Sequence, residues 1–246
     1  MFGLLFGSFY LVVATRLPKE ESIVSPGSHC DNCKHELKWY ELIPVISYII
    51  QGGKCRKCGA KIPFITVLIE VITAAAFCLS YYLYGFGYGF FALIILLSLS
   101  IIIFISDFKY LVILDWPLFI STGLIVILKY IYFGFTPSLK SLISGIILVI
   151  FMLLVKIIGD KVYKKESLGW GDVKLALFMG VVLGLRLGFA ALIIGSFIAL
   201  PYAIYYVAKK EEKEIPYGPF LITAVLLVFI FTDQIAGFIN SFFVIS

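Results

Sequence analysis

Long apolar runs are the feature that most constrains what this 246-residue chain can fold into. A helix of roughly 20 apolar residues crosses a bilayer core about 30 Å thick. Backbone groups in lipid must pair within their own segment, and the alternating pattern of a membrane β-strand is missing. Eight runs have about this length, although the first and the sixth are short, at residues 1–17, 63–84, 88–106, 111–133, 138–159, 173–187, 188–208 and 217–244. We therefore predict an all-α, polytopic membrane helix bundle of about eight transmembrane helices.

Lysine and arginine indicate the orientation, because they gather in the cytoplasmic loops of membrane proteins. Residues 18–62 and the alternate connections that follow carry most of the 20 basic residues. The other side carries only Lys129, Lys140 and Arg186. The first set is therefore expected to face the cytoplasm. This bias also accounts for the net charge of +5 without a nucleic-acid partner.

The first run ends at Arg16 without the small-residue cleavage site of a signal peptide. We expect a retained helix and, because the run is short for a span, a few further residues before it in the natural chain. Only residues 18–62 form a connection long and polar enough for a small domain. The expected domains are a first transmembrane helix at 1–17, a cytoplasmic domain at 18–62 and a transmembrane domain at 63–246.

Two C-x-x-C pairs lie in the connection 18–62. Their cysteines are Cys30, Cys33, Cys55 and Cys58. A two-residue gap lets both thiolates of a pair reach one ion, and two pairs complete the closed tetrahedral shell of a structural zinc. Disulfides are the alternative, which a reducing cytoplasm disfavours. His29 and His35 are alternative ligands, although solvated loop residues are the simpler interpretation. We predict a zinc-ribbon-like domain with structural zinc.

Two aspartates stand at the predicted membrane edge on the same side. Asp107 follows the run 88–106, and Asp172 comes just before the run 173–187. A charge at mid-bilayer costs about 2.5–3.5 kcal/mol on insertion scales, so each suggests a function, although a single one could be a plain helix-end charge. Gly169 and Gly171 allow close backbone approach before Asp172. Two adjacent carboxyls cannot both ionise, so one would hold a proton while the other activates water against a peptide carbonyl.

The order of several motifs along nearly the whole chain resembles that of bacterial type IV prepilin peptidases, which are GxGD-type membrane aspartyl proteases. The motifs are Gly7-Ser8-Phe9, Arg16-Leu17-Pro18, the two cysteine pairs with Ile43-Pro44 and Ser47-Tyr48 between them, Asp107, the segment Gly169 to Lys174, and the segment Ile215 to Phe220. The chain departs from the family pattern at Leu11, Leu114 and Thr66-Val67, where asparagine, proline and tyrosine-proline are usual. The aspartates are unaffected by these departures.

The resemblance implies that Asp107 and Asp172 are the catalytic pair. It implies that the substrates are prepilins or pseudopilins, membrane helices whose basic leader is removed at the cytoplasmic face of the bacterial inner membrane. It further implies methylation of the new amino terminus from S-adenosylmethionine. Glu70 would take part in methyl transfer or be a structural partner of a basic residue. Asp115 would pair with Lys174 or orient Asp107.

Other functions are possible for intramembrane carboxylates, above all a proton- or ion-coupled transporter. A transporter is expected to place its carboxylates at the bilayer midplane, often in repeated halves, and the sequence shows neither feature. A zinc-stapled scaffold without activity would not need the Gly169 to Asp172 turn. A metalloprotease is disfavoured, because the chain has two histidines and no His-Glu-x-x-His segment.

Overall fold

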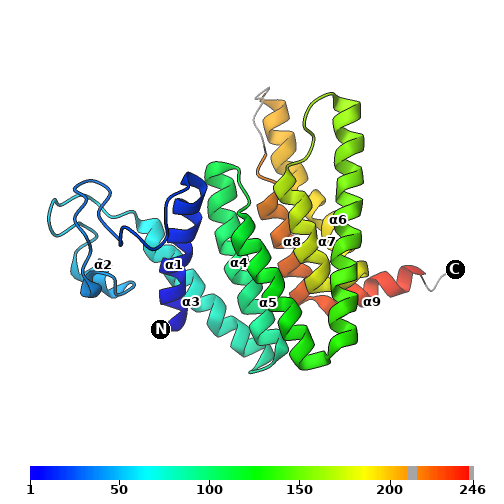
Figure 1. The fold of residues 1–246 in the computed structure, drawn as a ribbon, viewed down its shortest axis with the longest axis horizontal. Coiled ribbons are helices and arrows are strands. Elements are labelled where there is room, and N and C mark those ends of the chain that lie inside the picture. The colour runs from blue at the N-terminus through cyan, green and yellow to red at the C-terminus, as the bar shows by residue number, and fades with distance from the viewer. Residues whose placement is uncertain (210–214, 244–246) are drawn as a thin grey trace. The chain divides into compact units, whose positions relative to one another are not determined.

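The computed structural model describes residues 1–209 and 215–243. Helices dominate these residues, as predicted, and two isolated β-bridges are the only sheet-like pairings among them, at His29–Glu36 and Lys54–Lys61. The chain divides into two compact units, an amino-terminal unit at Met1–Phe86 and a carboxy-terminal unit at Gly87–Ser246. Each unit is described by itself (Figure 1).

The amino-terminal unit contains two long helices, α1 (Phe2–Arg16) and α3 (Phe64–Tyr84). Glycines let their backbones approach closely, since a Cβ atom on Gly7 would lie 2.7 Å from the Cα of Glu70. Small residues at a helix interface are typical of packing in membranes. Between the two helices lie the 3-10 helices η1 (Leu17–Lys19) and η2 (Trp39–Glu41) and the short helix α2 (Ile46–Ile50).

The carboxy-terminal unit is a bundle of apolar helices (Figure 1). Its helices are α4 (Tyr88–Tyr110), α5 (Asp115–Phe133), α6 (Phe135–Tyr163), α7 (Trp170–Ala208), α8 (Gly218–Ile230) and α9 (Thr232–Phe243). Fully buried side chains from five of them, α4 to α8, form the core, among them Leu96, Leu118, Leu148, Phe178 and Leu221. The closest packing is between α6 and α7, where a Cβ on Gly180 would lie 2.6 Å from the Cα of Gly145.

The helix α7 consists of two helices that meet at Gly184, which has a left-handed φ of 76° and a ψ of 177°. A Cβ on Gly188 would lie 3.7 Å from the Cα of Gly180, and Ser196 lines the same cavity as Asp172. Residues at equal distances on either side of Gly184 thus face each other, so the chain reverses direction there. The two predicted runs 173–187 and 188–208 correspond to these two halves.

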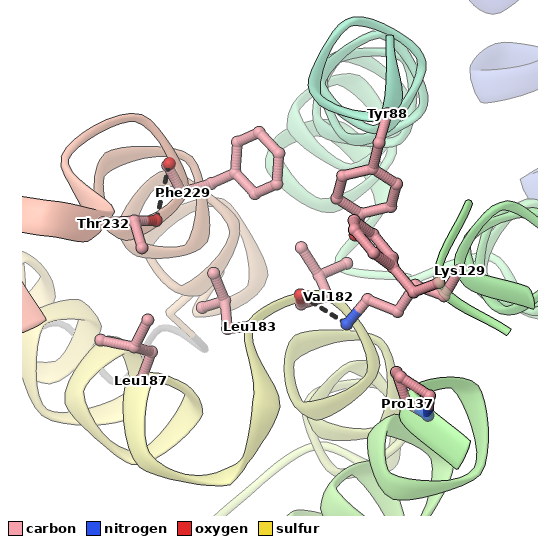
Figure 2. Close-up of a pocket in the computed structure, with 9 residues that line it drawn as sticks. Tyr88, Lys129, Pro137, Val182, Leu183, Leu187, Phe229 and Thr232 are labelled. Carbon is pink, nitrogen blue, oxygen red and sulfur yellow. Dashed lines mark hydrogen bonds between the residues drawn. The ribbon is translucent and has the colours of Figure 1, made fainter. Parts of the chain in front are cut away.

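Lys129 stabilises this reversal from α5. Its Nζ donates to the main-chain oxygen of Val181 at 2.7 Å and to that of Val182 at 3.1 Å. Figure 2 shows the second of these hydrogen bonds. The last carbonyls of a helix have no partner within it, and the helix dipole favours a cation at this end. Lys129 therefore caps the first half of α7. It also lines a cavity of about 290 Å³ with Tyr88, Phe229 and other mainly apolar residues.

Five described helices, α3 to α7, are long and apolar enough to cross a membrane, or up to six if α8 and α9 count as one span bent by 88°. The predicted number of about eight is higher for physical reasons. The first helix has only 15 residues, and the two halves of α7 count as one helix. The last run, 217–244, is split by the bend after Ile230, and its final residue lies outside the described part of the chain. The chain is nonetheless a multi-pass membrane protein by length and composition.

Candidate functional site

The four predicted metal-ligating cysteines come together in the amino-terminal unit. Their sulfur atoms all lie within 4.8 Å of one another. The Sγ atoms of Cys30 and Cys58 are 3.7 Å apart, and those of Cys33 and Cys55 are 3.9 Å apart. A tetrahedral zinc with Zn–S bonds of about 2.3 Å requires sulfurs about 3.8 Å apart. The cluster therefore fits a metal ion of this kind.

Two similar turns build the cluster. In the first, the N–H of Lys34 donates to the oxygen of Cys30 at 2.9 Å, and in the second the N–H of Gly59 donates to that of Cys55 at 2.9 Å. Lys34 and Gly59 both have a left-handed φ, of 56° and 71°, which closes each turn on its thiol pair. The backbone N–H of Ala60 lowers the pKa of the Cys58 thiol to about 6, while burial and the hydrogen bonds with the other cysteines raise the pKa of the Cys33 thiol to about 11.

The two histidines near the first pair have other partners. The Nδ1 of His29 lies 2.9 Å from the main-chain oxygen of Gly27, and the Nε2 of His35 lies 3.7 Å from the carboxylate of Glu41. Neither belongs to the cluster of possible metal ligands. The structure thus brings together the four cysteines alone.

Asp107 and Asp172 lie in the carboxy-terminal unit and line one cavity of about 1020 Å³. Asp107 is in the last turn of α4, and Asp172 is in the first turn of α7. Both side chains are buried, with 6% and 8% of their surface exposed. Their carboxyl groups interact electrostatically. Two helices therefore place acidic groups that are 65 positions apart in the sequence in the same cavity.

Glycines surround the pair because side chains there would collide with neighbours. The N–H of Gly218 donates to the Oδ2 of Asp107 at 3.1 Å, and a Cβ on Gly218 would lie 2.9 Å from that oxygen. A Cβ on Gly169 would lie 3.1 Å from the Oδ2 of Asp172. A Cβ on Gly171 would lie 2.8 Å from the Cβ of Ile113. At these three glycines the backbone thus lies close to a carboxylate of the aspartate pair or to the side chain of Ile113.

The cavity has an apolar part and a polar part. Its apolar walls come from α6 and α7, with Phe151, Met152, Val155, Leu192 and Ile193 among them. Its polar residues include Lys165 and Glu166 from the segment between these helices, and Tyr217, whose hydroxyl lies 2.8 Å from that of Ser196. An apolar cleft with a few converging polar groups is the usual form of a binding site.

The remaining predicted site residues lie outside this cavity. Lys174 pairs with Asp115, with its Nζ 2.7 Å from one carboxylate oxygen and 2.8 Å from the other. This is the first of the two arrangements that the sequence left open for Asp115. Glu70 is buried in the amino-terminal unit, where its Oε2 accepts the N–H of Val45 at 2.8 Å. It also forms a hydrogen bond with the side chain of Ser8, so its partners are a backbone group and a hydroxyl rather than a basic side chain.

Sequence reasoning missed Ser196, Glu166 and Lys156 near the cavity. Lys156 was detectable, because it interrupts an apolar run and an ionisable residue in such a run suggests a function. Ser196 gave no signal, since its position opposite Asp172 depends on the reversal at Gly184. Glu166 looked like one charge in a polar loop.

Comparison with known proteins places these features in a family. A model of the bacterial peptidase A24 N-terminal domain matches residues 1–84, and a model of the type IV leader peptidase family matches residues 94–204. No solved structure matches the chain significantly.

Curated relatives are similar over almost the whole chain. A prepilin leader peptidase/N-methyltransferase of Bacillus subtilis is 28% identical over 247 residues, which cover 97% of this chain and 95% of the relative. A type 4 prepilin-like proteins leader peptide-processing enzyme of Escherichia coli is 30% identical over 243 residues, which cover 89% of this chain and 87% of the relative. None of these comparisons supports a transporter. The resemblance seen in the sequence motifs is confirmed, and the chain belongs to the type IV leader peptidase family.

Proposed function

We propose that this protein is a membrane aspartyl endopeptidase that removes the basic leader of type IV prepilins or pseudopilins at the cytoplasmic face of the bacterial inner membrane. We propose also that it methylates the new amino terminus with S-adenosylmethionine. The observation that carries the peptidase proposal is the pair of buried carboxyls, Asp107 and Asp172, in one cavity. The names of the similar enzymes support both activities.

The two carboxyls can carry out peptide hydrolysis by acid–base catalysis. Two adjacent acids in an enclosed site share one proton, because both cannot ionise together. The ionised carboxylate takes a proton from a water molecule, whose oxygen bonds to the peptide carbonyl carbon. The protonated carboxyl gives its proton to the amide nitrogen, and the C–N bond then breaks. The N–H of Gly218, which donates to Asp107, holds that carboxyl in place.

The cavity suits a substrate that is itself a membrane helix. Its apolar walls on α6 and α7 match the apolar segment of a prepilin, and its polar end near Glu166 matches the start of a charged leader. The cytoplasmic position is supported by the distribution of basic residues, since only three of 20 are expected on the other side. Asp115 and Lys174 join the start of α5 to the first turn of α7 and are proposed to support Asp172.

The cysteine cluster is proposed to bind structural zinc, within a cytoplasmic domain at residues 18–62. The sulfur spacing and the closed shell of four cysteines support zinc without a catalytic role. Methyl transfer is proposed for the whole protein, without residues assigned to the methyl donor. Glu70, one candidate for that role, contacts the backbone of Val45.

The test is leader cleavage by purified protein in detergent or lipid, with a prepilin as substrate. Asp107→Asn and Asp172→Asn are each expected to reduce cleavage by at least about 1000-fold, because each removes one half of the acid–base pair. Asp233→Asn is the matched control, since Asp233 is exposed on α9 and does not line the cavity. Cleavage at the normal rate by either active-site variant would refute the catalytic assignment. Labelled S-adenosylmethionine in the same reaction measures methylation separately.

A further inference from the structure

Lys156 is a buried cation beside the cavity, and the proposed mechanism assigns it no role. It lies in α6 between Val155 and Ile157, and 4% of its surface is exposed. Its Nζ has three acceptors, the main-chain oxygen of Leu168 at 2.6 Å, the Oε1 of Glu166 at 2.8 Å and the Oδ2 of Asp160 at 3.3 Å. An ammonium group has three N–H donors, so these contacts account for all of them.

Two of the three acceptors of Lys156 lie in the segment that precedes Asp172. Glu166 and Leu168 line the cavity that contains Asp172. Leu168 is bonded to Gly169, whose backbone approaches the carboxylate of Asp172. The ammonium of Lys156 also lies 5.2 Å from the ring centroid of Trp170, the first residue of α7. One side chain therefore contacts three of the six residues before Asp172.

Asp160, one turn further along α6, holds the same segment from a second point. Its Oδ1 accepts the N–H of Ser167 at 2.6 Å and the hydroxyl of Ser167 at 2.8 Å. Gly159 lets Ser167 come this close, because a Cβ there would clash with the Ser167 hydroxyl. Lys156 and Asp160 thus form a two-point polar anchor for residues 166–168.

Few other contacts fix the position of the segment. Residues 164–167 are exposed, and the apolar packing comes from Leu168, which is half-buried and lies against the core. Gly169 and Gly171 have no side chains that could pack. Polar contacts to α6 are therefore the main restraint on residues 166 and 167.

We infer that Lys156 and Asp160 are positioning residues, which fix the segment 166–169 on α6 and so keep the Asp172 carboxyl where it faces Asp107. The inference rests on the proposed peptidase function, because it concerns the same site. The expected consequence of losing the anchor is a misplaced Asp172. A displacement of about 1 Å from reactive geometry can cost about 100-fold in rate.

The experiment compares Lys156→Met and Asp160→Ala with the wild type in prepilin cleavage. Lys156→Met removes the charge at similar length and is expected to lower kcat about 100-fold with KM changed less than about twofold. Asp160→Ala is expected to cause a smaller fall in kcat. Lys156→Arg keeps the charge and should recover at least part of the activity. Lys161→Met is the matched control, since Lys161 is an exposed lysine in the last turn of α6.

Hydrogen exchange at the amide of Ser167 provides a second measurement that does not depend on catalysis. Loss of the anchor is expected to speed this exchange by at least about tenfold, while amides in the core of α4 stay unchanged. A normal kcat in Lys156→Met would overturn the inference, as would a loss of activity that merely follows the amount of folded protein. If Lys156→Met does not accumulate in the membrane, a normal kcat and normal exchange in Asp160→Ala overturn it.

The two proposals fail in different ways. If the wild type does not cleave prepilin, the peptidase proposal fails, and the exchange measurement still decides whether the anchor holds the segment. If the wild type cleaves and Asp172→Asn does not, but the anchor variants behave normally, only the positioning role is wrong.

Discussion

The long loop of the amino-terminal unit and the helix bundle of the carboxy-terminal unit are stabilised by different interactions. Between α1 and α3, the 46 residues of the loop 17–62 contain only four buried positions, at Glu41, Pro44, Gly53 and Cys55. The carboxy-terminal unit instead has a continuous core of fully buried side chains such as Leu96, Phe178 and Leu221. A segment with so little apolar burial cannot offset the conformational entropy of ordering it. The comparison predicts that the loop needs a bound metal ion and a few polar contacts for its stability, whereas packing stabilises the bundle.

Metal removal is expected to have the largest effect and to affect only the loop. Structural zinc contributes on the order of 10 kcal/mol to the folding of small zinc-binding peptides. The variant Cys30→Ser, or treatment with a strong chelator, should therefore unfold the loop 17–62 and reduce the zinc content. Hydrogen exchange would show fast exchange there and unchanged protection in α4 to α8. Cys78→Ser is the control, because Cys78 lies outside the cluster.

Full zinc content in Cys30→Ser would contradict the four-cysteine site. Faster amide exchange in α4 to α8 as well would contradict the prediction that only the loop depends on the metal.

The corresponding test of the bundle introduces a side chain where two helices pack closely. Gly180→Leu places a side chain where a Cβ atom alone would lie 2.6 Å from Gly145. Overpacking of this kind typically costs 1–3 kcal/mol and occasionally more, so we expect destabilisation of about 3 kcal/mol. Thermal unfolding in detergent measures it. Gly123→Leu should be neutral or slightly stabilising, because no atom lies within 4 Å of a Cβ there and leucine favours helix. Equal effects of the two variants would argue against tight packing between α6 and α7.

Replacing Glu70 tests one of the polar contacts of the loop. Val45 has a left-handed φ of 62°, a conformation that costs about 1–3 kcal/mol in a non-glycine residue, and its N–H is bound by Glu70. Glu70→Met removes the acceptor at similar length, and we expect a loss of about 1–3 kcal/mol. Exchange of the Val45 amide should accelerate while the metal stays bound. Glu36→Gln, at an exposed position of the same loop, should change nothing. A Val45 amide that stays protected would show that the turn does not need Glu70.

The smallest effect is expected from the ion pair of Asp115 and Lys174. Their side chains are 50% and 38% exposed, so water weakens the attraction. A double-mutant cycle with Asp115→Asn and Lys174→Met should give a coupling of about 0.2–1 kcal/mol in thermal unfolding. A coupling of several kcal/mol would mean that ion pairs contribute to the bundle as much as packing does.

Much of the fold could be predicted because apolar runs and helices coincide in lipid. The run 63–84 agrees with α3 (Phe64–Tyr84) within one residue. The run 111–133 began too early, because Leu111 to Leu114 are apolar but form a loop in which Leu111 has a left-handed φ of 56°. Hydropathy cannot detect such a turn. It did predict two runs within α7, 173–187 and 188–208, but it placed the break after residue 187 rather than at Gly184, since glycine is common within membrane helices.

The sequence by itself determined the class of the molecule and the residues with chemical potential. The spacing of the cysteines was enough for the metal cluster, because a C-x-x-C turn is local. The tertiary structure decided which distant groups meet. It placed Asp172 beside Asp107 and the N–H of Gly218, and it directed Lys156 to the segment before Asp172. These contacts depend on how helices pack and where the chain reverses, and neither is encoded in the spacing of any single motif.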